Sequence, residues 1–281
     1  MRIYLMTDLE GVCGVTNFED WCTPASRYYE KAKDLLTREV NAAVEGFLEG
    51  GADGVTVADG HGHGAIDSTT IHARAELMRG WPKVWPFALD EGDYDAIAWV
   101  GQHAKSGTIQ GHLCHTGSFV CRDISVNGLS VGEFGRLALC ASELRIPVIF
   151  ACGDEAFARE AQALVPGVET VAVKRGVNTE PGHHLPAEAY SKLNTAAVHL
   201  STEEARSRIR AGAKKAVERA RDKDFGIIGL KPPYEMVAVY RSDATNPPRV
   251  SRTQHPKSVI ELFRLPLQLE AIEKADPLTL I

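Results

Sequence analysis

Side chains that bind metal ions follow three short apolar runs of the chain. These are residues 3–6 before Asp8 and Glu10, residues 52–58 before His61, and residues 95–100 before His103. We expect each run to be a buried strand of a largely parallel sheet, in which the carboxyl ends of the strands lie along one edge. Alternate residues of an extended segment point the same way, so Asp8 and Glu10 can share one site.

A third carboxylate, Glu133, opens a predicted helix soon after the Asn127-Gly128 dipeptide. Together, two imidazoles and three carboxylates form a mixed nitrogen and oxygen ligand set, which suits zinc, cobalt or manganese. These five side chains exceed the needs of one tetrahedral catalytic zinc. The set therefore predicts two ions that share a carboxylate.

Each of these residues also has an interpretation without a metal. Acidic residues at strand ends often cap helices or form turns, and Glu133 is also a first-turn acid that the helix dipole favours. His61 lies in a glycine-rich turn in which His63 is an equal candidate. The metal interpretation depends on several independent strand ends pointing to one place.

Residues 111–116 carry a second group of candidates, His112, Cys114 and His115. An unligated histidine of this segment near the metals can move protons during hydrolysis. A separate metal site here is less favoured, because no second matching pair completes it, and His112 also fits a structural role. Asn127 can donate to a developing oxyanion or serve as a turn residue, and its Asn-Gly context favours the turn.

Strand and helix patterns alternate along the first two thirds of the chain. Beyond the three runs above, we expect strands at 146–151 and 168–173, helices at 24–48, 133–144 and 155–164, and a hairpin at 119–131. This alternation predicts a three-layer α/β fold with a largely parallel or mixed central sheet.

The pattern changes beyond Lys174. Residues 175–185 lack periodicity and predict a loop, residues 201–223 predict a long charged helix, and a proline-rich segment with β character follows. We therefore expect an α/β metal-binding domain at residues 1–185 and a smaller α+β portion at residues 186–281.

The composition is that of an ordinary globular protein, with 281 residues, 44% hydrophobic and 24% charged. A net charge of -6 disfavours binding to a phosphate backbone, so no nucleic-acid partner is expected. The densest basic run, residues 206–221, alternates with Glu218 and alanines and predicts a solvated helix face.

The amino-terminal residues 1–6 are too short an apolar run for a secretory signal, and no stretch has the length of a membrane span. The six cysteines lie far apart without a Cys-x-x-Cys pair, which is typical of reduced thiols. These features predict a cytoplasmic protein with no membrane partner.

Several motifs occur in order along the chain. They are Thr7-Asp8-Leu9-Glu10-Gly11, Asp59-Gly60-His61, Gly101-Gln102-His103-Ala104, His115, Asn127-Gly128, Val131-Gly132-Glu133-Phe134-Gly135, Pro147-Val148, Gly153-Asp154 and Val171-Ala172-Val173-Lys174. Their order and spacing resemble the zinc D-aminopeptidase family, whose members are associated with dipeptide-transport operons. The resemblance covers about residues 1–175 well and the remainder loosely.

The resemblance implies that Asp8, Glu10, His61, His103 and Glu133 bind two zinc ions, with Asp8 as the bridge. It also implies that His115 is the catalytic histidine, as a proton shuttle or as a nucleophile. The expected activity is removal of the amino-terminal residue of short peptides, often D-residues. The expected assembly is a closed homo-oligomeric ring, a decamer by family resemblance.

The segment from Arg175 to His184 departs from the family pattern. If this loop lines the substrate pocket, the preference for D-residues is the first property in doubt, and His183 and His184 become candidates for a remodelled pocket. This loop keeps one other function open, that of a metal-dependent amidohydrolase or esterase acting on a small non-peptide substrate. A non-enzymatic binding protein that keeps the metal is a third alternative, which the carboxylate-rich ligand set disfavours because structural zinc sites are usually closed and sulfur-rich.

Overall fold

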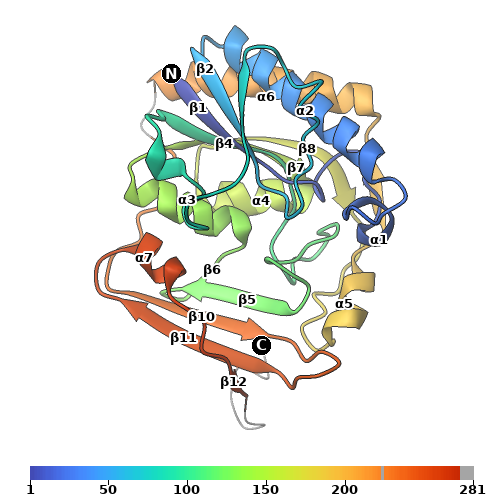
Figure 1. The fold of residues 1–281 in the computed structure, drawn as a ribbon, viewed down its shortest axis with the longest axis vertical. Coiled ribbons are helices and arrows are strands. Elements are labelled where there is room, and N and C mark those ends of the chain that lie inside the picture. The colour runs from blue at the N-terminus through green and yellow to red at the C-terminus, as the bar shows by residue number, and fades with distance from the viewer. Residues whose placement is uncertain (223–224, 273–281) are drawn as a thin grey trace.

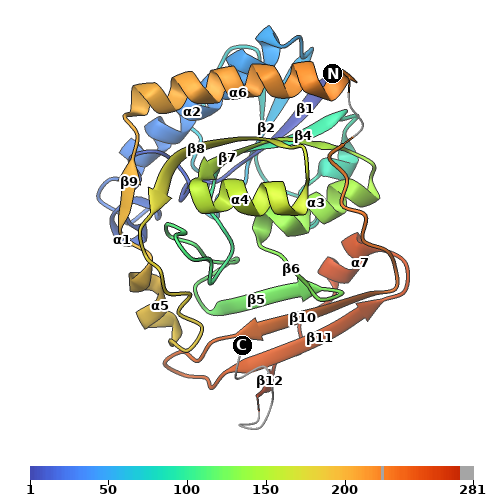
Figure 2. The same cartoon turned by 180° about the vertical axis from the view of Figure 1, so that it is seen from behind.

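Two β-sheets and two layers of helices build the molecule, as Figures 1 and 2 show from opposite sides. The computed structural model describes residues 1–222 and 225–272. The larger sheet has seven strands, in the spatial order β3 (Ala75–Met78), β2 (Gly54–Asp59), β1 (Arg2–Thr7), β4 (Ala96–Gln102), β7 (Val148–Asp154), β8 (Glu169–Gly176) and β9 (Ala197–His199). Its strands are parallel except β9, which pairs antiparallel to β8.

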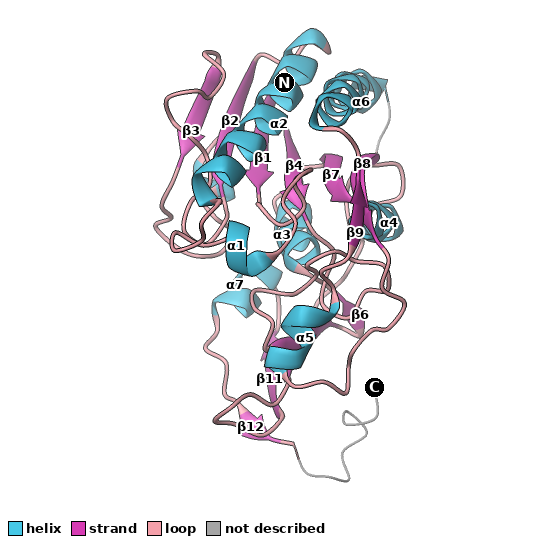
Figure 3. Ribbon diagram, turned by 90° about the vertical axis from the view of Figure 1, so that its right-hand side faces the viewer, coloured by secondary structure: helices cyan, strands magenta, loops and turns pink. Residues whose placement is uncertain are grey.

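Helices cover both faces of this sheet. The outer face carries α2 (Tyr29–Glu49) and α6 (Thr202–Asp222), and the face toward the second sheet carries α3 (Glu133–Glu143) and α4 (Glu155–Leu164). Figure 3 shows the same order of layers from the side. The predicted three-layer α/β fold with a mostly parallel central sheet is therefore confirmed.

The order of the strands reverses between β1 and β4. From β1 the chain goes through α2 to β2 on one side, whereas β4, β7 and β8 follow on the other side. Such a reversal leaves a crevice at the carboxyl ends of the two central strands, where ligands bind in open α/β sheets. The residues after β1 and β4 therefore occupy the most favourable place in this fold for a site.

Strand β1 is buried on both faces, as expected for the centre of a parallel sheet. Ile3 and Leu5 belong to the hydrophobic core under α2 and α6, whereas Tyr4 and Met6 belong to the core on the opposite face. This alternation follows from the two-residue period of an extended strand.

The helix that we expected at 24–48 begins five residues later, at Tyr29. A short helix, α1 (Phe18–Trp21), precedes it, with Asn17 accepting a hydrogen bond from the backbone of Asp20. The hydroxyl of Ser26 then donates to the carbonyl of Glu19 and accepts from the backbone of Thr23. These side-chain bonds hold residues 23–26 in a turn, because serine competes for backbone groups that a helix would use.

The smaller sheet has five antiparallel strands, in the order β12 (Glu270–Ala271), β11 (Arg249–His255), β10 (Tyr234–Tyr240), β5 (Cys121–Val126) and β6 (Leu129–Ser130). Asn127 and Gly128 both have positive φ, 50° and 80°, in the tight turn between β5 and β6. The predicted hairpin is thus confirmed, since two consecutive positive φ values characterise the type I′ turn. Two further short helices, α5 (Ala187–Leu193) and α7 (Val259–Arg264), flank this sheet.

Both sheets contain strands from each side of residue 185. Strand β9 completes the larger sheet, and β5 and β6 pair with the late strands of the smaller one. The predicted helix 201–223 corresponds to α6, with Lys223 outside the described residues, as are residues 273–281 of the predicted tail. The predicted domain boundary at residue 185 therefore stays a prediction.

All six cysteines are buried and unpaired, as expected for reduced thiols. Among the described residues, none of the helices combines the length and apolar character that crossing a bilayer requires.

Helices α2 and α6 pack closely because α2 has glycine at two contact positions. A Cβ atom on Gly46 would lie 2.2 Å from the carbonyl oxygen of Arg210, and one on Gly50 would lie 2.7 Å from that of Lys214. Backbone atoms cannot yield as a flexible side chain can, so a larger residue must push the helices apart.

We expect Gly46→Ala to lower the free energy of unfolding by about 1–3 kcal/mol, because overpacking shifts the backbone of α6. Gly54→Ala is the matched control, since a Cβ atom there meets nothing within 4 Å. Chemical denaturation of both variants checks this, and equal stability of the two would contradict the packing argument.

Candidate metal centre

The carboxylate of Asp8 lies between two imidazoles at the reversal point of the sheet. Its Oδ1 is 3.2 Å from Nδ1 of His61, and its Oδ2 is 3.2 Å from Nε2 of His103. Glu10 Oε2 lies 3.3 Å from the same nitrogen of His61, and Glu133 Oε2 lies 3.7 Å from that of His103. The structure therefore brings together all five predicted metal ligands, one carboxylate on each outer side and Asp8 in the middle.

Backbone carbonyl groups orient the imidazoles of this group. His61 Nε2 is 2.8 Å from the carbonyl oxygen of Cys22, and His103 Nδ1 is 2.8 Å from that of Ala104. Carbonyl oxygens only accept hydrogen bonds, so these nitrogens carry protons. The other ring nitrogens face the carboxylates and can offer a lone pair to a metal ion once they lose their own protons. This arrangement is characteristic of metal-bound histidines, whose second nitrogen donates to a carbonyl or carboxylate.

The concentration of carboxylates makes the site attract positive charge. Burial acts to raise the pKa of Asp8, but the neighbouring imidazoles of His103 and His61 prevail and hold that pKa well below its usual value. Burial acts to lower the pKa of His61, yet Glu10 and Asp8 raise it to about 12. Burial also acts to lower the pKa of His103, while Glu133 and Asp8 raise it to about 10. A divalent cation supplies the same compensation and is often the largest local charge in such a site.

Two further observations fit a metal. Glu10 Oε2 and His103 Nε2 are buried and have no hydrogen-bond partner within the described part of the chain. Such orphaned atoms are rare in folded proteins and often mark an ion. Ligand atoms of Asp8, Glu10 and His103 also lie within 4.8 Å of one another. The donor set of imidazole and carboxylate suits zinc.

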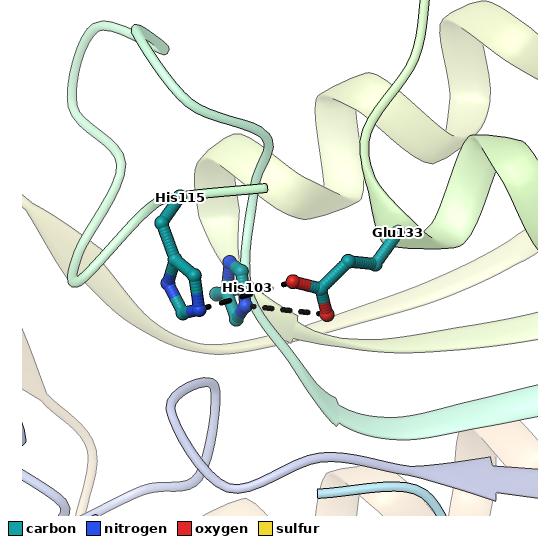
Figure 4. A group of neighbouring side chains, drawn as sticks. All are labelled: His103, His115 and Glu133. Carbon is teal, nitrogen blue, oxygen red and sulfur yellow. Dashed lines mark ion pairs between the residues drawn. The ribbon is translucent and has the colours of Figure 1, made fainter. Parts of the chain in front are cut away.

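His115 lies beside this group, as Figure 4 shows together with His103 and Glu133. Its ring stacks on that of His103 with centroids 4.1 Å apart, and its Nε2 is 3.8 Å from Glu133 Oε1. Its Nδ1 is 2.9 Å from the carbonyl oxygen of Leu113, which leaves Nε2 as the unprotonated nitrogen. Ligand atoms of His115, His103 and Glu133 also lie within 4.8 Å of one another, close enough to hold one metal ion. His115 is therefore a candidate metal ligand as well as a candidate catalytic residue.

Sequence reasoning missed Gln102, although it lies within the Gly101-Gln102-His103 motif. Its amide donates to Asp8 Oδ2 at 3.0 Å and to Glu133 Oε2 at 3.4 Å. Glu133 also accepts from the backbone of Gly117 at 2.6 Å. These donors fix the orientation of the carboxylates.

The other histidine candidates are not members of the five-residue group. His63 is exposed and lines the cavity that opens over the group, whereas His61 is the histidine of the glycine-rich turn that meets the carboxylates. His112 is buried between the carbonyl groups of Thr16 and Thr195, and burial, aided by Lys174, lowers its pKa to about 2. This neutral histidine fits the structural role.

Cys114 and Asn127 also have structural partners. The thiol of Cys114 lies 3.3 Å from the hydroxyl of Tyr190. The Asn127 amide donates to the carbonyl groups of Lys231 and Pro233, which attaches the hairpin turn to the segment before β10. The oxyanion role of Asn127 therefore has no geometric support within this chain.

A cavity of about 600 Å³ opens over the five-residue group. Its lining combines the acidic residues with aromatic and apolar side chains, namely Met6, Phe18, Trp85, Phe87, Trp99, Phe119 and Leu137. A largely apolar cavity with a few convergent polar groups is typical of a small-molecule site. No sequence period marks these aromatic residues, which come from separate loops and elements.

The divergent loop at residues 175–184 lies away from this cavity. The carbonyl of Asn178 accepts from the backbone of Gln110 at 2.7 Å, and His183 lines a different groove, together with Lys105. None of the residues 175–184 lines the cavity over the five-residue group. The hypothesis that this loop remodels the pocket is therefore not supported within the chain.

Comparisons with known proteins find similar peptidases. The family model of the D-aminopeptidases, peptidase family M55, matches residues 1–251. A D-aminopeptidase of Bacillus subtilis (strain 168) is 31% identical over 182 residues, which are 63% of this chain. The match spans 65% of that relative's length, just under two thirds.

The fold is also that of a solved structure. The zinc-dependent D-aminopeptidase DppA from Bacillus subtilis, a self-compartmentalizing protease, superimposes with a TM-score of 0.77 and 22% sequence identity, over 94% of each chain. Since the family model covers most of the sequence, this chain belongs to the D-aminopeptidase family.

Proposed function

We propose that this protein is a zinc-dependent aminopeptidase that removes the amino-terminal residue of short peptides, with D-residues as the first candidates. The observation that carries the proposal is the Asp8 carboxylate, with one oxygen 3.2 Å from Nδ1 of His61 and the other 3.2 Å from Nε2 of His103. A carboxylate between two oriented imidazoles suits a bridge between two ions.

The residues divide into two groups around this bridge. Glu10 and His61 would hold one zinc, His103 and Glu133 would hold the other, and Asp8 would bind both. Gln102 keeps Asp8 and Glu133 in place through its amide. When bound, zinc lowers the pKa of a coordinated water toward neutrality and polarises a carbonyl group.

His115 would transfer a proton from its place beside Glu133 and above His103. Its proton is on Nδ1, held by the Leu113 carbonyl, so Nε2 can accept a proton and later donate it to the departing amine. Direct attack by the same nitrogen on the carbonyl is the other form of this proposal. Phe18 and Phe119 pack against His115 with ring centroids 6.3 Å and 4.8 Å away, which limits the movement of its ring.

The assembly and location proposed here follow from family membership. DppA is described as self-compartmentalizing, and we propose that this chain also forms a closed ring, a decamer in the family pattern. Such a chamber would admit only short peptides. A cytoplasmic location agrees with the six unpaired cysteines.

The function is tested with matched D- and L-alanyl dipeptides, amides and esters, with the metal content measured on the same preparation. We expect release of the amino-terminal residue by protein that holds about two zinc ions per chain, and the ratio of D to L rates defines the stereochemical preference. Metal-loaded protein that cleaves esters or non-peptide amides but no peptide would replace this function with that of an amidohydrolase.

Replacing the bridge should release metal. In Asp8→Asn the amide keeps the size of the side chain but removes the charge and one ligand oxygen, so retained zinc should fall well below one ion per chain after dialysis, on the order of a complete loss. Asp59→Asn is the control, because Asp59 ends the neighbouring strand but accepts from the backbone of Ala65 and Ile66. Equal zinc in both variants would refute the assignment of Asp8.

Removing the imidazole of His115 separates catalysis from ligation. We expect His115→Ala to lower kcat by about 10²–10⁴ while zinc content stays near that of the unmodified protein. His184→Ala, which alters an exposed loop histidine, should change neither quantity. A parallel loss of zinc in His115→Ala would instead identify His115 as a ligand.

A further inference from the structure

Helix α3 brings a second charged side chain to the cavity. Arg136 follows Glu133 by three residues, so the two side chains lie on one face of the helix, about 5–6 Å apart at their Cβ atoms. Both line the cavity, and Arg136 is the one permanent cation among its lining residues in the described part of the chain.

The position of the Arg136 guanidinium is defined by its neighbours. The group lies 4.6 Å from the ring centroid of Trp85, in the geometry of a cation–π contact. A Cβ atom on Gly117 would lie 3.9 Å from its Nη2, and the backbone nitrogen of the same Gly117 donates to Glu133. The Arg136 guanidinium therefore lies in the part of the cavity lining that also contains Glu133, one of the proposed zinc ligands.

No carboxylate of the described residues forms an ion pair with Arg136, although the side chain is half-buried. Its Nε is buried and has no hydrogen-bond partner in the same set of residues. An arginine offers its donors in a planar fork that matches a carboxylate. Stacking on Trp85 holds this fork in place without using the donors.

We propose that Arg136 binds the terminal carboxylate of the peptide substrate, which makes dipeptides the preferred substrate class. This inference rests on the proposed aminopeptidase function. Glu133, one of the proposed zinc ligands, and Arg136 are three residues apart on α3, which is about one helical turn. One residue of extended chain spans about 3.3–3.6 Å, so the carboxylate that follows the scissile bond by one residue suits this separation.

The two ends of a dipeptide carry opposite charges, and the cavity has the matching polarity. The acidic residues that would hold the zinc ions suit the free amino group and the scissile carbonyl, while Arg136 suits the carboxylate. A peptide entering in the reverse direction would place its carboxylate against Asp8 and Glu10. Arg136 therefore also selects the direction in which the peptide binds.

The test compares an alanyl dipeptide, of the enantiomer that the unmodified protein cleaves, with the same dipeptide as its carboxyl-terminal amide. We expect the unmodified protein to favour the free acid, with a lower KM. In Arg136→Gln the KM for the acid should rise roughly tenfold to hundredfold, the loss of a hydrogen bond to a charged group. The amide should be cleaved by this variant as by the unmodified protein, which also shows that the variant is folded.

Two further variants sharpen the comparison. Arg136→Lys keeps the charge but loses the planar fork and the stacking, so it should retain only part of the preference for the acid. Arg159→Gln removes an exposed arginine that pairs with Glu155, and it should behave as the unmodified protein.

Binding provides a readout that does not depend on turnover. A dipeptide analogue with a reduced, uncleavable peptide bond should bind the unmodified protein more tightly than its amide in calorimetry, and Arg136→Gln should abolish the difference. If the unmodified protein cleaves both substrates and Arg136→Gln keeps the preference for the acid, the inference is overturned while the aminopeptidase function stands. If the unmodified protein cleaves no peptide at all, the function itself fails.

Discussion

Three carboxylates lie close together at the buried edge of the central sheet, and the rest of the site depends on how their charge is compensated. Asp8 is buried between His61 and His103, and Glu10 has a buried oxygen without a hydrogen-bond partner among the described residues. Burying uncompensated carboxylates costs several kcal/mol for each ion. Two orientated imidazoles offset part of this cost, and bound cations offset it more fully, so metal binding and local stability are coupled.

The fold brings these charges together by letting backbone segments approach closely. A Cβ atom on Gly11 would lie 2.1 Å from the carbonyl oxygen of Gln102, and one on Gly153 would lie 1.7 Å from the same atom. Gly101 has a φ of 78°, a conformation that favours glycine. The loops after β1, β4 and β7 can therefore converge on one point, where His103 leaves the sheet beside Asp8. A larger residue at these glycines would separate the ligands before it affected the outer layers.

Much of this arrangement could be predicted from sequence because it depends on short-range patterns. Apolar runs that end in Asp8, His61 and His103 define both the strands and the positions of their polar ends. The aromatic walls of the cavity could not be predicted, since Phe18 of α1 and Trp85 of a later loop are far apart in the sequence and only the tertiary structure brings them together. The pairing of β5 with β10 could not be predicted for the same reason, because it joins residues more than a hundred positions apart in the sequence.

The smaller sheet supplies none of the five proposed ligands, but helix α3 connects it to the site. The amino-terminal end of α3 carries Glu133, and at its carboxyl-terminal end Glu143 accepts hydrogen bonds from Ser258 and Val259 at 2.6 Å. Those residues begin α7, which packs against β10 and β11. The smaller sheet thus holds the far end of the helix whose first residue reaches the metal centre. Strand β5 of the smaller sheet also follows the segment that carries His115 along the chain. A shift of this sheet would therefore move the proposed catalytic histidine and Glu133 together.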